Sequence, residues 1–210
     1  MNLKSSFFDR RAKVRFIHDD FHAADNLAEE LLLNISSETS RPIVFICIGT
    51  DRSTGDSLGP LVGSLLEEKN LQSFFVYGTL DEPIHAMNLV EKLKEIHTNH
   101  VDPYIIGIDA CLGRIKNVGV IQVGHGPVKP GAGVNKELPA VGDIHITGIV
   151  NVSGFMEFFV LQNTRLNLVM KMAKTIAGGI YQASLLYPKQ SLSELNWMED
   201  EQTNKRANGN

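Results

Sequence analysis

Carboxylate residues follow three apolar segments of the sequence, each where the segment gives way to a polar loop. The first loop, 49–60, reads GTDRSTGDSLGP and contains Asp56. The second carries Asp81 and Glu82, and Asp109 directly follows the apolar residues 105–108. Because the carboxyl ends of parallel strands meet at one edge of a sheet, where ligands bind, we expect these side chains to lie close together.

Asp56 and Asp109 have the surroundings needed for general acid–base catalysis on a water molecule. Asp109 emerges from an apolar run, whose low dielectric should raise its pKa. Asp56 lies at or just before an expected helix start, where backbone N–H groups and the helix dipole favour the ionised carboxylate. One protonated and one ionised carboxyl group can donate and accept a proton, respectively. Structural roles stay open: Asp56 as a helix N-cap, Asp109 as an acceptor for the next turn, and helix capping for Asp81 and Glu82.

Other chemistries fit the 49–60 loop less well. It is rich in Gly, Ser and Thr like a phosphate-binding loop, but it lacks Gly-Lys-Ser/Thr and Gly-x-Gly-x-x-Gly, and its two aspartates would repel phosphate. No Gly-x-Ser-x-Gly elbow surrounds Ser57, which argues against a serine hydrolase. We expect no cofactor, but a divalent metal remains possible, with Asp56, Asp109 and one histidine as ligands. His145 is the histidine we name for this site; His85 and His125 also lie near loops at plausible edges.

The elements that position these residues follow from the hydrophobic pattern. Continuous apolar runs predict strands buried on both faces, and apolar residues at helical spacing predict helices between the first three of them. The predicted strands are 43–48, 73–77, 104–108, 118–123 and 143–150, and the predicted helices are 21–33, 57–69, 83–96, 155–162 and 166–186. The connection 110–117 is too short for a helical crossover, so we predict that the third and fourth strands form an antiparallel pair in a mixed sheet. The Gly- and Pro-rich segment 124–142 predicts a long functional loop.

Length and composition limit the class of protein. The chain has 210 residues, of which 43% are hydrophobic and 21% charged, with a net charge of −4. This predicts one domain over 1–190 with an N-terminal helical extension, followed by a polar tail over 191–210. The negative charge argues against nucleic-acid and membrane partners. We see no targeting or membrane-spanning segment, and Cys47 and Cys111 lack a Cys-x-x-Cys spacing, so we expect a cytoplasmic protein.

Two segments resemble a known enzyme family. Residues 49–60 and 106–110 (IGIDA) resemble the spore germination protease (GPR) family and, more distantly, the hydrogenase maturation endopeptidases. The whole chain, especially 142–156 (GDIHITGIVNVSGFM), is similar to the YyaC family of sporulation proteins. The resemblance implies a phosphorylase/hydrolase-like, three-layer α/β/α domain with a mixed, mostly parallel sheet, and a role in endospore formation. GPR-type enzymes are atypical aspartic peptidases with one aspartate at the end of each of two strands, and these positions match Asp56 and Asp109.

The chain also departs from these families. The hydrogenase maturation enzymes have a glutamate at the position of Asp56 and a histidine with no match here, so nickel chemistry is not implied. The chain is much shorter than GPR and has no evident propeptide, so substrate and autoactivation do not carry over.

Our leading hypothesis is a sporulation-associated peptidase in which Asp56 and Asp109 hydrolyse peptide bonds of a spore protein, in the cytoplasm of the forespore or mother cell. The alternative is a non-catalytic binding or assembly module on the same fold. In that case a homo-oligomer interface could form from the N-terminal Phe7, Phe8 and Phe16 or from the apolar run 155–161. A third possibility is a metal-dependent hydrolase.

Overall fold

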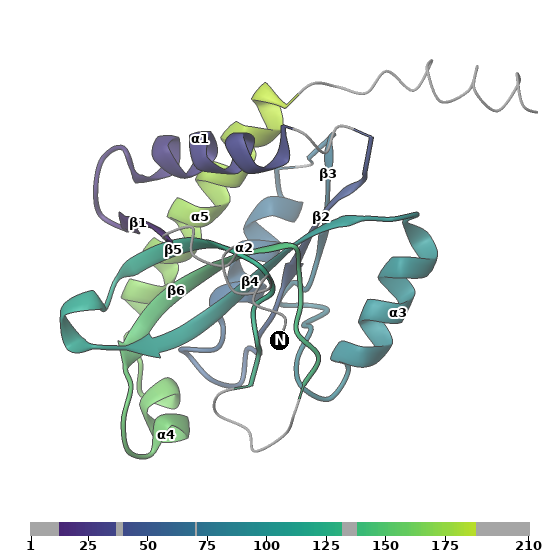
Figure 1. The fold of residues 1–210 in the computed structure, drawn as a ribbon. Helices are drawn as coiled ribbons and strands as arrows, with labels where there is room; N and C mark the ends of the chain where they lie inside the picture. Colours follow the sequence, from purple (N-terminus) through teal and green to yellow (C-terminus); the bar gives the residue numbers. More distant parts are fainter. Residues whose placement is uncertain (1–12, 37–39, 70, 132–137, 188–210) are drawn as a thin grey trace, which may run out of the picture.

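A mixed six-stranded sheet forms the centre of the computed structural model, which describes residues 13–187 except 37–39, 70 and 132–137 (Figure 1). The strand order is β1-β5-β6-β4-β2-β3. Neighbours β6, β4, β2 and β3 are parallel, whereas β5 runs antiparallel to both β6 and β1. The strands are β1 (Val14–Ile17), β2 (Ile43–Cys47), β3 (Phe74–Tyr77), β4 (Tyr104–Gly113), β5 (Val120–His125) and β6 (Ile144–Val152). This arrangement confirms the predicted mixed, mostly parallel sheet.

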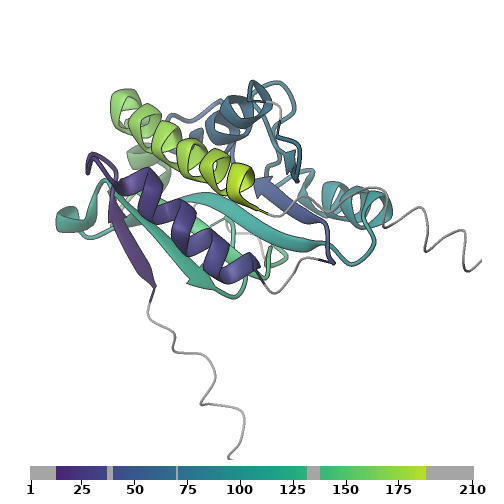
Figure 2. The same ribbon diagram turned by 90° about the horizontal axis from the view of Figure 1, so that it is seen from above.

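Helices cover both faces of the sheet, as Figures 1 and 2 show. They are α1 (Ala23–Ile35), α2 (Leu58–Glu67), α3 (Leu89–Asn99), α4 (Glu157–Gln162) and α5 (Leu166–Leu186). The larger core lies between the sheet and α1, α2 and α5, and a smaller core lies under α3 on the other face. Neighbouring residues of β2 enter different cores, Phe45 the larger and Val44 the smaller, because side chains alternate along a strand. No helix among the described residues has the length and apolar character needed to cross a membrane.

The predicted pairing of the third and fourth strands is wrong, because β6 lies between β4 and β5. Strand β6 pairs with β4 in parallel and with β5 in an antiparallel register. A short 3-10 turn, η1 (Ile115–Asn117), separates β4 from β5, and the N–H of Gly119 then donates to the carbonyl of Ile149 in β6. The first seven residues of β6 are buried. Such a strand is more stable inside the sheet than at its edge, which explains the insertion.

Strand β1 is an element that the hydrophobic pattern does not reveal. It is only four residues long and its apolar run is interrupted by Arg15, and it pairs with β5 through Phe16 and Ile121. Phe16 is 9% exposed and belongs to the larger core. Phe16 is therefore not available for the oligomer interface considered above. Phe7, Phe8 and the predicted tail over 191–210 lie outside the described residues.

Helix α3 begins six residues later than the predicted helix over 83–96. Ile84 instead forms a parallel bridge with Ile48, beyond the end of β2. The side chain of Asn88 accepts from the N–H of His85 at 2.8 Å and donates to the carbonyl of Pro83 at 3.0 Å. Such side-chain bonds to the backbone compete with helix formation, which explains the delayed start. Asp81 and Glu82 are exposed and precede an irregular segment, so the helix-capping role is wrong for them.

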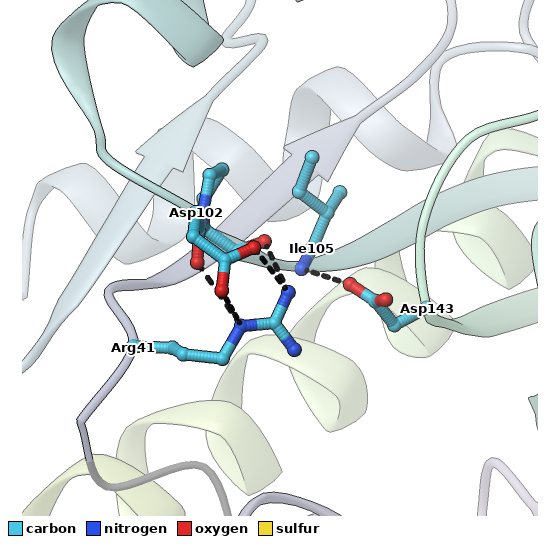
Figure 3. A network of polar contacts seen from close by, with 5 residues as sticks. Arg41, Asp102, Ile105 and Asp143 are labelled. Atoms are coloured by element: carbon cyan, nitrogen blue, oxygen red, sulfur yellow. Dashed lines mark hydrogen bonds and ion pairs between the residues drawn. The ribbon is translucent and has the colours of Figure 1, made fainter.

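A polar network joins the amino ends of β2, β4 and β6, at the sheet edge opposite the predicted site (Figure 3). Arg41, just before β2, donates from Nε to a carboxylate oxygen of Asp102 at 3.2 Å and from Nη2 to the carbonyl of Pro103 at 3.1 Å. Asp143 accepts from the N–H of Ile105 at 2.8 Å, and its own N–H donates to the carbonyl of Ile105 at 2.7 Å. Asp143 therefore holds the start of β6 in register beside β4.

Candidate active site

Asp56 and Asp109 line one pocket of about 460 Å³ at the carboxyl end of β2. Asp109 lies on β4, directly after Ile108, which is paired with the last residue of β2, Cys47. Asp56 lies in the loop that joins β2 to α2. The structure thus brings together two carboxylates that are 53 positions apart in sequence, as the rule for parallel strand ends predicts. Asp81 and Glu82 do not line this pocket.

Backbone hydrogen bonds fold the Asp56 loop tightly against its surroundings. The N–H of Thr50 donates to the carbonyl of Asp56 at 3.1 Å, and the N–H of Gly55 donates to the carbonyl of Leu161 in α4 at 2.9 Å. Gly49 has a φ of 151°, and a Cβ at this position would overlap the carbonyl oxygen of Asp56. The loop therefore requires glycine at position 49 to close on itself and hold Asp56 at the pocket.

Burial raises the pKa of Asp109 to about 8. The residue as a whole is only partly buried, but its carboxyl group is packed among protein atoms. The N–H of Ala110 donates to Oδ1 at 2.8 Å and opposes the rise, while the negative charge of Asp56 adds to it. Asp109 therefore carries a proton at neutral pH. Because the charge of Asp56 contributes to this effect, Asp56 is the carboxyl group that ionises first.

The expectation that the start of a helix lowers the pKa of Asp56 is wrong. Ser57 occupies the N-cap position of α2, and no side chain makes a capping hydrogen bond there. Burial raises the pKa of Asp56 above its ordinary value, and the hydroxyl of Ser53 opposes this rise. Both carboxyl groups are thus shifted in the same direction, because both face a poorly solvated pocket.

Ser53 is a site residue that the sequence pattern did not single out. The residue is 6% exposed, and among the described residues its Oγ finds no partner with hydrogen-bond geometry. It lines the pocket and lowers the pKa of Asp56. Buried hydroxyls usually have a hydrogen-bond partner, and the carboxyl group of Asp56, whose pKa this hydroxyl lowers, is the group on which Ser53 acts.

The remaining walls of the pocket are mostly apolar. Pro130 and Leu138 come from the 124–142 segment, which was expected to be a functional loop, and Phe158 and Leu161 come from α4. Phe158 is 52% exposed although it is a large aromatic residue. These walls lower the local dielectric around the two carboxyl groups. Sequence reasoning missed the α4 residues because nothing in their local pattern connects them to Asp56.

The three histidines considered for a metal site lie in different places. His85 lines the pocket, whereas His125 and His145 do not. The Nδ1–H of His145 donates to the carbonyl of Gly126 at 2.8 Å, and burial lowers the pKa of this imidazole. Within the described ranges, no three His, Cys, Asp or Glu side chains are grouped so that they could hold a metal ion. His145 therefore lies outside the pocket that Asp56 and Asp109 line.

Comparison with known proteins finds similarity to a family model, to a curated protein and to a solved structure. The family model described as "Protein of unknown function (DUF1256)" matches residues 15–179. The Bacillus subtilis (strain 168) protein described as "Uncharacterized protein YyaC" is 56% identical over 182 residues, which are 86% of this chain and 89% of that protein. Among solved structures, the NiFe hydrogenase maturation protease HycI from Thermococcus kodakarensis KOD1 gives a TM-score of 0.44 at 17% identity, covering 69% of this chain and 93% of that one.

Proposed function

This chain belongs to the DUF1256 family of proteins of unknown function, and we propose for it a peptidase activity in which Asp56 and Asp109 form the acid–base pair. The similarity to the Bacillus subtilis protein confirms the family resemblance noted from residues 142–156. One observation carries the proposal: a protonated Asp109 and an Asp56 that ionises first line the same pocket. Such a pair provides an acid and a base at neutral pH.

The proposed reaction is hydrolysis of a peptide bond by a water molecule held between the two carboxyl groups. The Asp56 carboxylate accepts a proton from the water molecule while the water oxygen attacks the carbonyl carbon of the substrate. Asp109 then donates its proton to the peptide nitrogen as the C–N bond breaks, which releases a carboxylic acid and an amine. Transfer of the proton from Asp56 to Asp109 restores the starting state. The apolar walls strengthen these electrostatic effects by excluding water.

We propose a spore protein as the substrate and the forespore or mother cell of a spore-forming bacterium as the compartment. The resemblance of residues 49–60 and 106–110 to the germination protease family supports this assignment. A cavity of about 460 Å³ is also of a size that accommodates a peptide bond with a flanking side chain.

The first test is cleavage of spore proteins by the purified protein and by its Asp56→Asn and Asp109→Asn variants. New chain termini are identified by mass spectrometry after incubation with a spore extract. We expect each substitution to lower the cleavage rate by about 10²- to 10⁴-fold, because each removes one proton-transfer group. Asp51→Asn, an exposed change in the same loop that does not line the pocket, is the matched control and should retain full activity.

Three outcomes would contradict the peptidase proposal. Full cleavage by either pocket variant would remove Asp56 or Asp109 from the reaction. Failure of the unmodified protein to cleave any spore protein would favour the binding module, for which the exposed Phe155 and Phe159 of the apolar run 155–161 offer a docking surface. Loss of activity to a chelator would indicate a metal-dependent hydrolase.

The dependence of kcat/KM on pH provides a second test. The reaction needs Asp56 ionised and Asp109 protonated, so activity should fall at both ends of the pH range. We expect the alkaline limb at about pH 8, where Asp109 loses its proton, and the acid limb above pH 3.8, because burial raises the pKa of Asp56 above that ordinary value. Activity that keeps rising well above pH 8 would contradict the role of Asp109 as the acid.

A further inference from the structure

We infer that His85 is a third catalytic residue of this pocket, whose Nε2–H donates a hydrogen bond to the carbonyl oxygen of the scissile peptide bond. His85 lines the same pocket as Asp56 and Asp109 but comes from a different segment, between β3 and α3. The inference rests on the proposed peptidase function and adds to it the group that stabilises the developing oxyanion.

The hydrogen bonding of His85 determines which ring nitrogen carries the proton. The backbone N–H of Met87 donates to Nδ1 at 3.3 Å. Since a backbone N–H can only donate, Nδ1 must be the unprotonated acceptor, and the neutral ring carries its proton on Nε2. Across the described part of the chain, Nε2 has no hydrogen-bond partner. His85 therefore has a free N–H donor at the pocket.

Hydrogen bonds fix the backbone of the segment that carries His85. The N–H of His85 donates to Oδ1 of Asn88, whose Nδ2 donates to the carbonyl of Pro83. The N–H of Gly49 donates to the carbonyl of Ile84 at 2.8 Å, which joins this segment directly to the Asp56 loop. Residues 83–88 depart from the predicted helix through these same contacts. A donor held in place before the reaction costs little reorganisation, and this is the property that oxyanion stabilisation requires.

The reaction also needs a donor that the two aspartates cannot supply. Ionised Asp56 only accepts hydrogen bonds, and the proton of Asp109 is committed to the leaving nitrogen. The oxygen of the tetrahedral intermediate then has no stabilising partner unless another side chain provides one. Other donors line the pocket, but Arg52 lies at the exposed surface of the loop and the hydroxyl of Ser53 acts on Asp56. His85 combines a defined donor with a fixed backbone.

The substitutions His85→Gln and His85→Asn separate a catalytic role from a structural one. The amide nitrogen of glutamine reaches about as far as Nε2 and can donate there, whereas the oxygen of asparagine lies near the place of Nδ1 and can keep the bond from Met87. For a catalytic His85, we expect kcat to fall by about 10²- to 10³-fold in His85→Asn with little change in KM, and by only about tenfold in His85→Gln. A residue that merely holds the loop would give the opposite order.

Cleavage of a spore-protein substrate by both variants is measured beside the unmodified protein, the Asp56→Asn variant and His97→Gln, an exposed control on α3. Nitrogen-15 NMR of the unmodified protein gives an independent readout, in which His85 should show the Nε2–H tautomer. If the unmodified protein is active and Asp56→Asn is not, full kcat in His85→Asn overturns this inference and leaves the peptidase proposal standing. An Nδ1–H tautomer also overturns it. If the unmodified protein cleaves nothing, the peptidase proposal fails first and this inference falls with it.

Discussion

Asp109→Asn should make the protein more stable at alkaline pH while strongly lowering its proposed activity. Folding raises the pKa of Asp109 from 3.8 to about 8, so the folded protein binds this proton more tightly than the unfolded chain does. The stability that this binding contributes is complete below pH 3.8 and is lost as the pH rises to 8. Asparagine is neutral throughout, keeps an acceptor for the N–H of Ala110 and has no such loss. At about pH 9 we expect a gain on the order of a few kcal/mol in the free energy of unfolding, and little change at about pH 4.

Denaturant titrations of the unmodified protein, Asp109→Asn and Asp51→Asn at several pH values measure this effect. The Asp51→Asn control should follow the unmodified protein, because this aspartate is exposed. Parallel curves for all three proteins would mean that Asp109 is ionised at little cost in the folded state. A substitution that removes a site residue and stabilises the protein is what a trade-off between activity and stability predicts. The pocket buries the carboxyl group of Asp109, which costs stability at alkaline pH but keeps the proton that the reaction needs.

Gly59→Ala should destabilise the protein by about 3 kcal/mol or more. Gly59 lies in the first turn of α2, and a Cβ there would overlap the carbonyl oxygen of Ile48 and lie 2.8 Å from its backbone nitrogen and carbonyl carbon. These are backbone atoms of the residue that directly follows β2, so neither partner can move aside cheaply. The helix must shift outward, and it carries the end of the Asp56 loop with it. The variant should therefore lose stability and cleavage activity together.

Gly178→Ala is the matched control for Gly59→Ala. Gly178 lies inside α5, and its new Cβ would meet only the Cβ of Ala24 at 3.6 Å, which is an ordinary contact. Replacing a helical glycine by alanine without a clash should stabilise the protein by about 0.5–1 kcal/mol. Thermal and denaturant unfolding of the two variants measure both values. Equal effects in the two variants would contradict the close approach of α2 to β2.

The sequence predicted best those elements whose pattern is long and local. The apolar positions over 166–186 match the bounds of α5, because a helix of six turns repeats its signal several times. Strand β2 is similarly clear, since burial on both faces makes every residue apolar. The hydrophobic pattern does not predict strand β1, because it is only four residues long. It also predicts too early a start for α3, because the hydrogen bonds of a single side chain, that of Asn88, delay the helix.

The meeting of Asp56 and Asp109 was also within reach of the sequence, because parallel strands bring their carboxyl ends to one edge whatever their exact order. The surroundings of the two carboxyl groups could not be predicted from the sequence. Leu138 and Phe158 reach the pocket from distant segments, and β6 enters the sheet between β4 and β5. His85 lines the pocket only because residues 83–88 are not helical. The direction of the pKa shift of Asp56 follows from these long-range contacts, since burial depends on every segment that packs around a group. The residue types and their strand ends are local properties of the sequence, whereas solvation and the third polar group of the site are decided only by the tertiary structure.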